Sequence, residues 1–167
     1  MRKAFLILSL ILLPLLASAQ QFSFGYFSYD EVLKSMSDYA IVQHNMQELR
    51  AKYNAEAKRS EDEFNTKYEA FLDGQKDFAP SIMEKRQAEL QELMEKNIAF
   101  KDNSRRLLAQ AEKDAYAPLD AKIKAALQTV GKSKGLAFIL NTDSNSTPYI
   151  DPAFGQNVTV AVKEALK

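Results

Sequence analysis

Two long, charged segments with regularly spaced apolar residues occupy the middle of the chain. Residues 39–73 contain no proline or glycine, and their apolar or small residues follow each other at steps of three or four. These positions are Met46, Leu49, Tyr53, Ala57, Ser60, Phe64, Tyr68 and Phe71. Successive steps of three, four and four residues add up to a repeat of eleven residues. Such a repeat predicts a nearly straight helix with one apolar stripe. Its length would be about 50 Å at about 1.5 Å per residue, so we expect it to project from a domain of this size.

A turn and a second long helix follow. Gly74 and Pro80 lie close together and predict a turn over residues 74–80, after which Ser81 and Glu84 fit a capping box. The next segment, up to residue 116, has heptad spacing at Met83, Leu90, Asn97, Ser104 and Ala111, and at Arg86, Leu93, Phe100 and Leu107. Two helices of similar length joined by a short turn predict an antiparallel hairpin arm over residues 39–118. Pro118 is expected to kink the second helix or to end it.

The two ends of the chain predict short strands and helices. Apolar residues alternate over residues 22–27, which predicts a strand, and Ser28 with Glu31 fits a capping box for a short helix. Ser37 is a candidate cap for the long helix after it. Near the other end, residues 136–140 form a continuous apolar run, as expected of a strand buried on both faces.

A third strand and a last helix are predicted after residue 146. Residues 147–151 fit a strand that Pro148 confines to an edge or a strand start. The last helix, residues 157–166, would have Asn157 as its cap. Its apolar face would consist of Val158, Val162 and Leu166.

The fold class that follows is mainly α with a small β base. The arm would extend from an α+β body made of residues 20–38 and 119–167, with strands from both ends of the chain. So small a core would be marginal alone, and we therefore expect several subunits to share one.

The first nineteen residues have the pattern of a secretory signal peptide. Arg2 and Lys3 precede an apolar stretch, residues 4–16, and a small-residue cleavage site ends at Ala19. A membrane-spanning helix would need about 18 or more uninterrupted apolar residues, and this run is shorter. We therefore expect export, cleavage near Ala19 and a mature protein without a membrane span.

Charge and cysteine content limit the classes of partner and the cellular compartments that fit the chain. Lys and Arg total 22 and Asp and Glu total 22, so loss of residues 1–19 leaves a mildly acidic protein, and nothing indicates nucleic-acid binding. The chain has no cysteine, which excludes disulfides, a thiol nucleophile and a lipid-modified cysteine. An exported chain without disulfides favours a bacterial envelope compartment.

Candidate chemistry is sparse. His44 is the only histidine and lies between the stripe positions, so a histidine metal cluster is impossible. Residues 143–154 begin like a calcium loop, but Pro148 and Phe154 stand where that loop needs glycine and glutamate. No phosphate-binding loop, nucleophile elbow or zinc motif is present. We expect neither enzyme activity nor a cofactor or metal.

The order of elements resembles the Skp (OmpH) family of periplasmic chaperones over essentially the whole mature chain. Residues 24–33 resemble the opening strand and helix of that family, and residues 135–140 with 149–151 look like its closing strand pair. The resemblance implies a homotrimer whose bases form a shared β-barrel-like body. It also implies arms that enclose a cavity, where unfolded outer-membrane proteins are held without ATP. Residues 40–117 carry thirteen Lys and Arg against fifteen Asp and Glu, unlike the basic arms of the family, which leaves at most a weak association with the envelope surface.

Two sets of candidate site residues follow. Those expected to contact unfolded clients are Phe64, Tyr68, Phe71, Phe78, Met83, Met94 and Phe100. Most of them also fit the seam between the two helices, whereas Phe78 and Met94 fit it less well and are better contact candidates. Those expected in the trimer base are Phe22, Phe24, Tyr26, Leu136, Phe138, Leu140 and Tyr149.

A second function also fits the long rods and the export signal. The chain could be a structural or adaptor hairpin in the periplasm that docks on one folded envelope partner. Such a protein would have a well-packed seam, a fixed stoichiometry and no affinity for unfolded chains. The split sheet favours the chaperone, because a plain spacer needs no strands.

Overall fold

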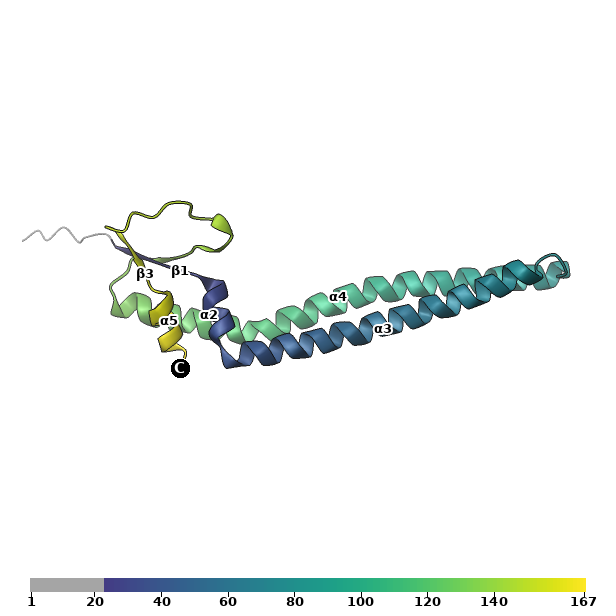
Figure 1. The fold of residues 1–167 in the computed structure, drawn as a ribbon, viewed down its shortest axis with the longest axis horizontal. Helices are drawn as coiled ribbons and strands as arrows, with labels where there is room; N and C mark the ends of the chain where they lie inside the picture. Colours follow the sequence, from purple (N-terminus) through teal and green to yellow (C-terminus); the bar gives the residue numbers. More distant parts are fainter. Residues whose placement is uncertain (1–22) are drawn as a thin grey trace, which may run out of the picture. The chain divides into compact units, whose positions relative to one another are not determined.

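A computed structural model of the chain describes residues 23–167 and is mainly helical (Figure 1). The predicted signal peptide and Phe22 lie outside the described residues. The elements are β1 (Phe24–Phe27), α2 (Tyr29–Ser35), α3 (Ser37–Gly74), α4 (Pro80–Ser133), β2 (Ile139–Asn141), the 3-10 helix η2 (Asp143–Asn145), β3 (Gly155–Asn157) and α5 (Thr159–Ala165). They form two compact units: the arm, Met36–Ala121, and the base, which in the described part comprises residues 23–35 and 122–167.

The base contains a three-stranded parallel sheet in the order β2-β1-β3. Gly25 of β1 lies opposite Ile139 of β2 on one side and Gln156 of β3 on the other. The strand from the beginning of the chain therefore lies between two strands from its end. The predicted mainly helical fold with a small sheet is confirmed. The sheet is open within the chain, with β2 and β3 as its edges, so the barrel-like closure is not seen here.

The predicted strand at residues 147–151 is wrong. These residues form part of a loop in which Tyr149 is 77% exposed, and the third strand lies at Gly155–Asn157 instead. A turn at Asp151 delays the strand: its carboxylate accepts a hydrogen bond from the Ala153 amide at 2.9 Å, and its carbonyl accepts one from the Gly155 amide at 2.9 Å. Local polar bonding of this Asx type competes with strand pairing.

The apolar run at residues 136–140 also differs from the prediction. Only its last two residues belong to β2, and the run is not buried on both faces, because Phe138 is 43% exposed. The Phe138 ring stacks on Phe24 of β1 with a centroid distance of 5.3 Å. An edge strand of an open sheet has fewer neighbours than a central one, which explains the partial burial.

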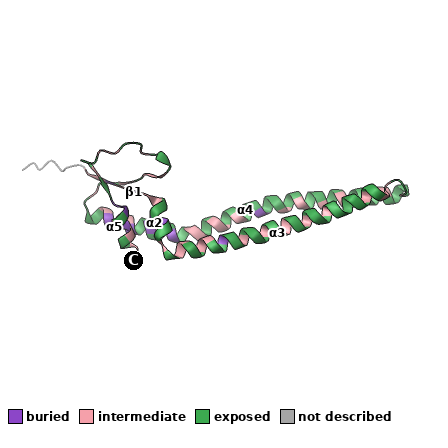
Figure 2. Cartoon of the chain, in the orientation of Figure 1, coloured by how far each residue is buried: buried purple, intermediate pink, exposed green. Residues whose placement is uncertain are grey.

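The core of the base lies between the sheet and its helices. Gly25 and Phe27 are the buried positions of β1, and a Cβ at Gly25 would come within 2.9 Å of Leu136. The other buried apolar residues of the base are Val32, Leu33, Ile123, Ala126, Val130, Val158 and Val162. Figure 2 shows the buried residues concentrated in these elements. Val158 and Val162 were correctly placed on the buried face of the last helix, whose N-cap residue is Val158 rather than Asn157.

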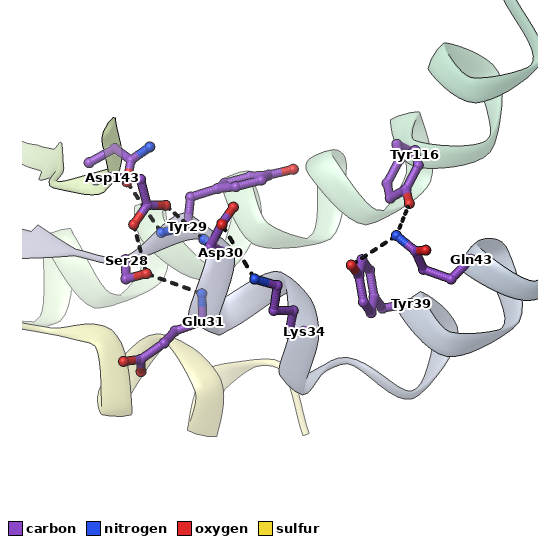
Figure 3. Close-up of polar contacts among 10 residues, drawn as sticks. Ser28, Tyr29, Asp30, Glu31, Lys34, Tyr39, Gln43, Tyr116 and Asp143 are labelled. Atoms are coloured by element: carbon purple, nitrogen blue, oxygen red, sulfur yellow. Dashed lines mark hydrogen bonds and ion pairs between the residues drawn. The ribbon is translucent and has the colours of Figure 1, made fainter. Parts of the chain in front are cut away.

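A set of hydrogen bonds ties the start of α2 to the segment after β2 (Figure 3). Asp143 accepts hydrogen bonds from the Asp30 amide and the Ser28 hydroxyl, both at 2.8 Å. The predicted Ser28 cap is confirmed, since its Oγ accepts from the Glu31 amide at 3.1 Å. Glu31 does not complete the capping box; it forms an ion pair with Lys163 of α5 at 2.8 Å. Side chains from the C-terminal part thus satisfy the free amides of an N-terminal helix.

Helix α4 ends with a left-handed glycine. Gly135 has a φ of 62°, and the Leu136 amide donates to the Gly131 carbonyl at 2.9 Å, as in a Schellman motif. Gly131 is itself inside the helix, and its carbonyl accepts this hydrogen bond.

Gly135→Ala should lower the free energy of unfolding by about 1 kcal/mol, because an L side chain is disfavoured at positive φ. The control is Gly131→Ala. A Cβ there would meet Ile139 at an ordinary 3.6 Å, and alanine favours the helix, so stability should rise by about 0.5–1 kcal/mol. Urea unfolding monitored by circular dichroism measures both. Equal effects of the two substitutions would contradict the assignment.

A candidate binding groove on the helical arm

Helices α3 and α4 run antiparallel in the arm and are joined by polar and aromatic contacts. Near the start of α3, the Gln43 amide donates to the hydroxyls of Tyr39 and Tyr116, both at 2.9 Å (Figure 3). Burial raises the pKa of the Tyr116 hydroxyl. Further along, Arg50 pairs with Glu112 at 2.7 Å. These contacts fix the register of the two helices.

The apolar stripe of α3 follows the predicted eleven-residue repeat. Its positions are buried or half-buried except Tyr68, which is exposed. Tyr53 of this stripe faces Phe100 of α4 with a centroid distance of 6.2 Å. Figure 2 shows that the rest of the α3 surface is mostly exposed. The repeat was therefore a correct guide to which side of α3 faces its partner.

The heptad predicted for α4 is wrong at Arg86 and Leu107, which are both exposed. Apart from Glu112, which pairs with Arg50, the buried or half-buried residues in the middle of α4 are Asn97, Phe100, Ser104, Leu108, Ala111 and Ala115. Their steps of three and four match the eleven-residue spacing of α3 rather than a heptad. A helix stays in contact with a nearly straight partner only if its contacting residues shift around the helix axis at the same rate as those of the partner.

The ends of α4 also differ from prediction. The helix begins at Pro80, one residue before the predicted cap Ser81, and the Ala79 carbonyl accepts from the Met83 amide at 2.9 Å. Proline is favoured at a first helical position because its missing N–H is not needed there. Of the two outcomes predicted for Pro118, the end of the helix is wrong, because α4 continues through it. Likewise, α3 begins at Ser37, with Met36 as the N-cap.

Phe78 closes the turn between the two helices. Its ring lies over Gly74, where a Cβ would come within 2.7 Å of it, and 6.2 Å from the ring of Phe71. Phe78 is half-buried by these contacts. It therefore has a packing role in the turn, which leaves less of its surface for a client than the sequence indicated.

A groove in the distal half of the arm combines apolar walls with open access. This arm groove has a volume of about 390 Å³ and is lined by Glu61, Phe64, Asn65, Met94, Asn97, Ile98 and Lys101. Met94 is 47% exposed and Ile98 is 55% exposed. Phe64 from α3 stacks on Tyr68 with a centroid distance of 5.9 Å, extending the apolar surface. Large apolar groups with this exposure are typical of binding surfaces when they cluster.

Three of the four polar residues of the arm groove, Glu61, Asn97 and Lys101, are already engaged. Lys101 forms an ion pair with Glu61 across the two helices, and the Asn97 amide donates to the Ser60 carbonyl at 3.1 Å. These contacts hold the helices at the groove. They leave mainly the apolar side chains of the groove to contact another molecule.

The structure brings together only some of the residues predicted to contact clients. Phe64 and Met94 line the arm groove, and Tyr68 stacks beside it. Phe71 and Phe78 lie at the turn. Met83 and Phe100 are half-buried residues of α4.

Sequence reasoning missed two exposed apolar residues. Ile98 lies four residues after Met94, and Leu72 lies four residues after Tyr68, so each pair shares one helix face. The four-residue spacing of these apolar pairs was the sequence signal that could have identified the two residues.

Of the residues predicted for the trimer base that the structure describes, Phe24, Tyr26 and Leu140 belong to the sheet and Leu136 and Phe138 precede β2. Phe24 and Tyr26 are the half-buried positions of β1, and Leu136 and Leu140 are half-buried too. Phe138 and Tyr149 are more exposed, as is Phe154 in the loop before β3. Large exposed apolar side chains are typical of interaction surfaces when they cluster.

Within residues 23–167 there is no cluster of three or more histidine or acidic side chains placed to hold a metal ion. None of the helices in that same range is long and apolar enough to span a bilayer.

Comparison with known proteins shows a family through one sequence model and a fold through a solved structure. Residues 23–166 match the sequence model of a family described as outer membrane protein (OmpH-like). No curated protein matches the chain. Among solved structures, the chain is similar to a proposed OmpH-like outer membrane chaperone from Caulobacter crescentus CB15, with a TM-score of 0.69 and 17% sequence identity. The match covers 87% of this chain and 83% of the other.

Proposed function

Because the chain belongs to the OmpH-like family of outer membrane proteins, we propose that it is a holdase chaperone that binds unfolded outer-membrane proteins and prevents their aggregation. It works without ATP and is not an enzyme. The protein acts in the periplasm after cleavage of the signal peptide near Ala19. The similar Caulobacter crescentus structure, itself described as an outer membrane chaperone, supports the proposal at the level of the fold.

The arm groove is the observation that carries this proposal. Met94 and Ile98 expose about half of their surface beside Phe64, and three of the four polar residues around them are already bonded. An unfolded β-barrel chain exposes many apolar side chains in varied order. A groove with a flexible methionine and no unpaired charge can accept such side chains without requiring one sequence.

The proposed assembly is a homotrimer in which the bases of three copies share a core. Its support is the open parallel sheet of the base, where the exposed Phe138 stacks on Phe24 of β1. A second and third copy would cover these side chains and the edges of β2 and β3. The arms of three copies would then supply several grooves to one client, which raises the effective affinity of a weak site.

The direct test uses size-exclusion chromatography with light scattering on residues 20–167. The protein is run alone and with an outer-membrane β-barrel protein diluted from urea. We expect a trimer that keeps the barrel protein soluble and co-elutes with it. A monomer or dimer that leaves the barrel protein to precipitate would refute the proposal and would favour an adaptor that docks on a folded envelope partner.

Met94→Gln combined with Ile98→Gln should weaken client binding about tenfold. The two side chains lose apolar contact area worth about 25 cal/mol per Å², and loss of about 55 Å² corresponds to that factor. The matched control is Ile41→Gln, since Ile41 is also exposed on the arm but lies outside the groove. Anisotropy of a labelled unfolded barrel protein gives the dissociation constants. Equal losses in the two variants would contradict a role for the groove.

A further inference from the structure

The arm groove contains no unpaired charge. Glu61 and Lys101 are the only ionisable residues in its lining, and they pair with each other. The remaining polar residues are Asn65 and Asn97, and Asn97 is bonded to the opposite helix. A charged side chain that entered the groove would lose water without gaining an opposite charge, which is unfavourable.

The rest of the arm is neutralised in the same way. Residues 36–121 contain thirteen Lys and Arg and seventeen Asp and Glu. At least nine of those thirteen cations pair with a carboxylate. They are Arg50, Lys58, Arg59, Lys67, Lys85, Arg86, Lys96, Lys101 and Arg105.

Most of these ion pairs lie within one helix. Lys58 with Asp62 and Lys96 with Glu92 are examples, at 2.9 Å and 2.6 Å. The hydrogen bond from Lys96 lowers the pKa of Glu92, and the hydrogen bond from Arg59 lowers the pKa of Glu56. Both carboxylates therefore stay charged and paired at neutral pH.

Such pairs have consequences for how a client is attracted. The fields of two opposite charges a few ångströms apart largely cancel at the distance from which a client approaches. Exposed charges are also screened beyond about 10 Å at ordinary salt. The small acidic excess is spread along a rod of about 50 Å. The arm thus has no cationic surface that could attract anionic segments over a distance.

We infer that this chain captures its clients through uncharged apolar and aromatic side chains alone, so that its affinity for them is independent of ionic strength. The inference rests on the proposed function and specifies the class of segment that the arm groove accepts. Clients rich in acidic residues gain nothing from this arm, and stretches with apolar side chains on one face are preferred.

The experiment measures the dissociation constant of the mature protein for a labelled, urea-diluted outer-membrane β-barrel protein at about 50 mM and about 500 mM NaCl. We expect less than a threefold change between the two, with any change toward tighter binding, since salt strengthens apolar association. A dissociation constant that rises threefold or more overturns the inference and leaves the holdase function intact. Failure to bind at either concentration overturns the holdase function itself.

A variant with a cationic arm provides the salt dependence expected when charge attracts the client. The substitutions Glu56→Gln, Asp62→Asn, Glu63→Gln, Glu89→Gln, Glu92→Gln and Asp102→Asn remove the carboxylates of ion pairs within one helix. With an acidic client, this variant should bind more tightly than wild type at about 50 mM NaCl and lose that gain at about 500 mM. Circular dichroism confirms that the helices are retained. A wild-type salt dependence as steep as that of the variant would overturn the inference.

Discussion

Ile123→Ala should lower the free energy of unfolding by about 2–5 kcal/mol. Ile123 is 2% exposed in the part of α4 that belongs to the base, and it is among the largest fully buried side chains. Its truncation removes buried apolar groups and leaves a cavity that a tightly packed core fills only in part. The base has few other large buried residues, so this loss is a large share of the stability of a small core.

The matched control is Ile98→Ala. It makes the same chemical change on the same helix, but Ile98 is 55% exposed, so the loss of stability should stay within about 0.5 kcal/mol. Urea unfolding at one fixed protein concentration measures both variants, because the stability of an oligomer depends on concentration. Similar midpoints for the two variants would contradict the burial assigned to Ile123.

The helices were predictable because their signals are local. The eleven-residue stripe of α3 needs only the spacing of residues such as Tyr53 and Phe64, and glycine and proline marked the turn. Where the prediction for α4 was wrong, at Leu107, the cause was the partner: the helix follows the drift of α3 rather than a heptad of its own. Pairing between helices is a tertiary effect, which one segment does not reveal.

The strands were harder to place because they are short and depend on partners distant in sequence. Residues 147–151 have strand-like composition, yet the turn at Asp151 moves the strand to Gly155–Asn157. Gly155 and Gln156 carry little strand propensity of their own, and they become a strand by pairing with Phe24 and Gly25 of β1. Pairing with β1, from the start of the chain, therefore sets the position of β3, and no local sequence pattern indicates that position.

The candidate site was predicted in part for a similar reason. Phe64 and Met94 were chosen for their size and position, and the structure places them in one groove. Ile98 was missed because it lies off the stripe, and the packing of Phe78 over Gly74 was missed because it depends on the geometry of the turn. Exposure and turn packing are properties of the folded arm.

Asp143→Ala should lower the free energy of unfolding by about 1–3 kcal/mol at neutral pH. Asp143 accepts hydrogen bonds from the Asp30 amide and the Ser28 hydroxyl at 2.8 Å, and so ties the first turn of α2 to a segment over a hundred residues away. Removal of the carboxylate leaves an amide without its cap and a hydroxyl without its acceptor, and each loss costs about 0.5–2 kcal/mol. Thermal or urea unfolding of both proteins measures the difference.

The same contacts give the effect a defined dependence on pH. The Asp30 amide, followed by the Ser28 hydroxyl, lowers the pKa of Asp143 below its ordinary value of 3.8. A carboxyl group with a lowered pKa in the folded state stabilises the protein above its unfolded pKa, and the contribution is lost as pH falls through the folded pKa. The difference in stability between wild type and Asp143→Ala should therefore be constant at neutral pH and shrink only below about pH 4.

Asp30→Ala is the control for this pH dependence. Asp30 is an exposed carboxylate of the same turn whose side chain pairs with Lys34 at 3.5 Å, so its removal should cost no more than about 0.5 kcal/mol. A large effect of Asp30→Ala, or an effect of Asp143→Ala that persists unchanged at about pH 2, would show that the charge of Asp143 is not what holds α2. With the expected result, the segment after β2 acts as the cap of α2. The short helix α2 then depends on a segment that is synthesised only after the whole arm.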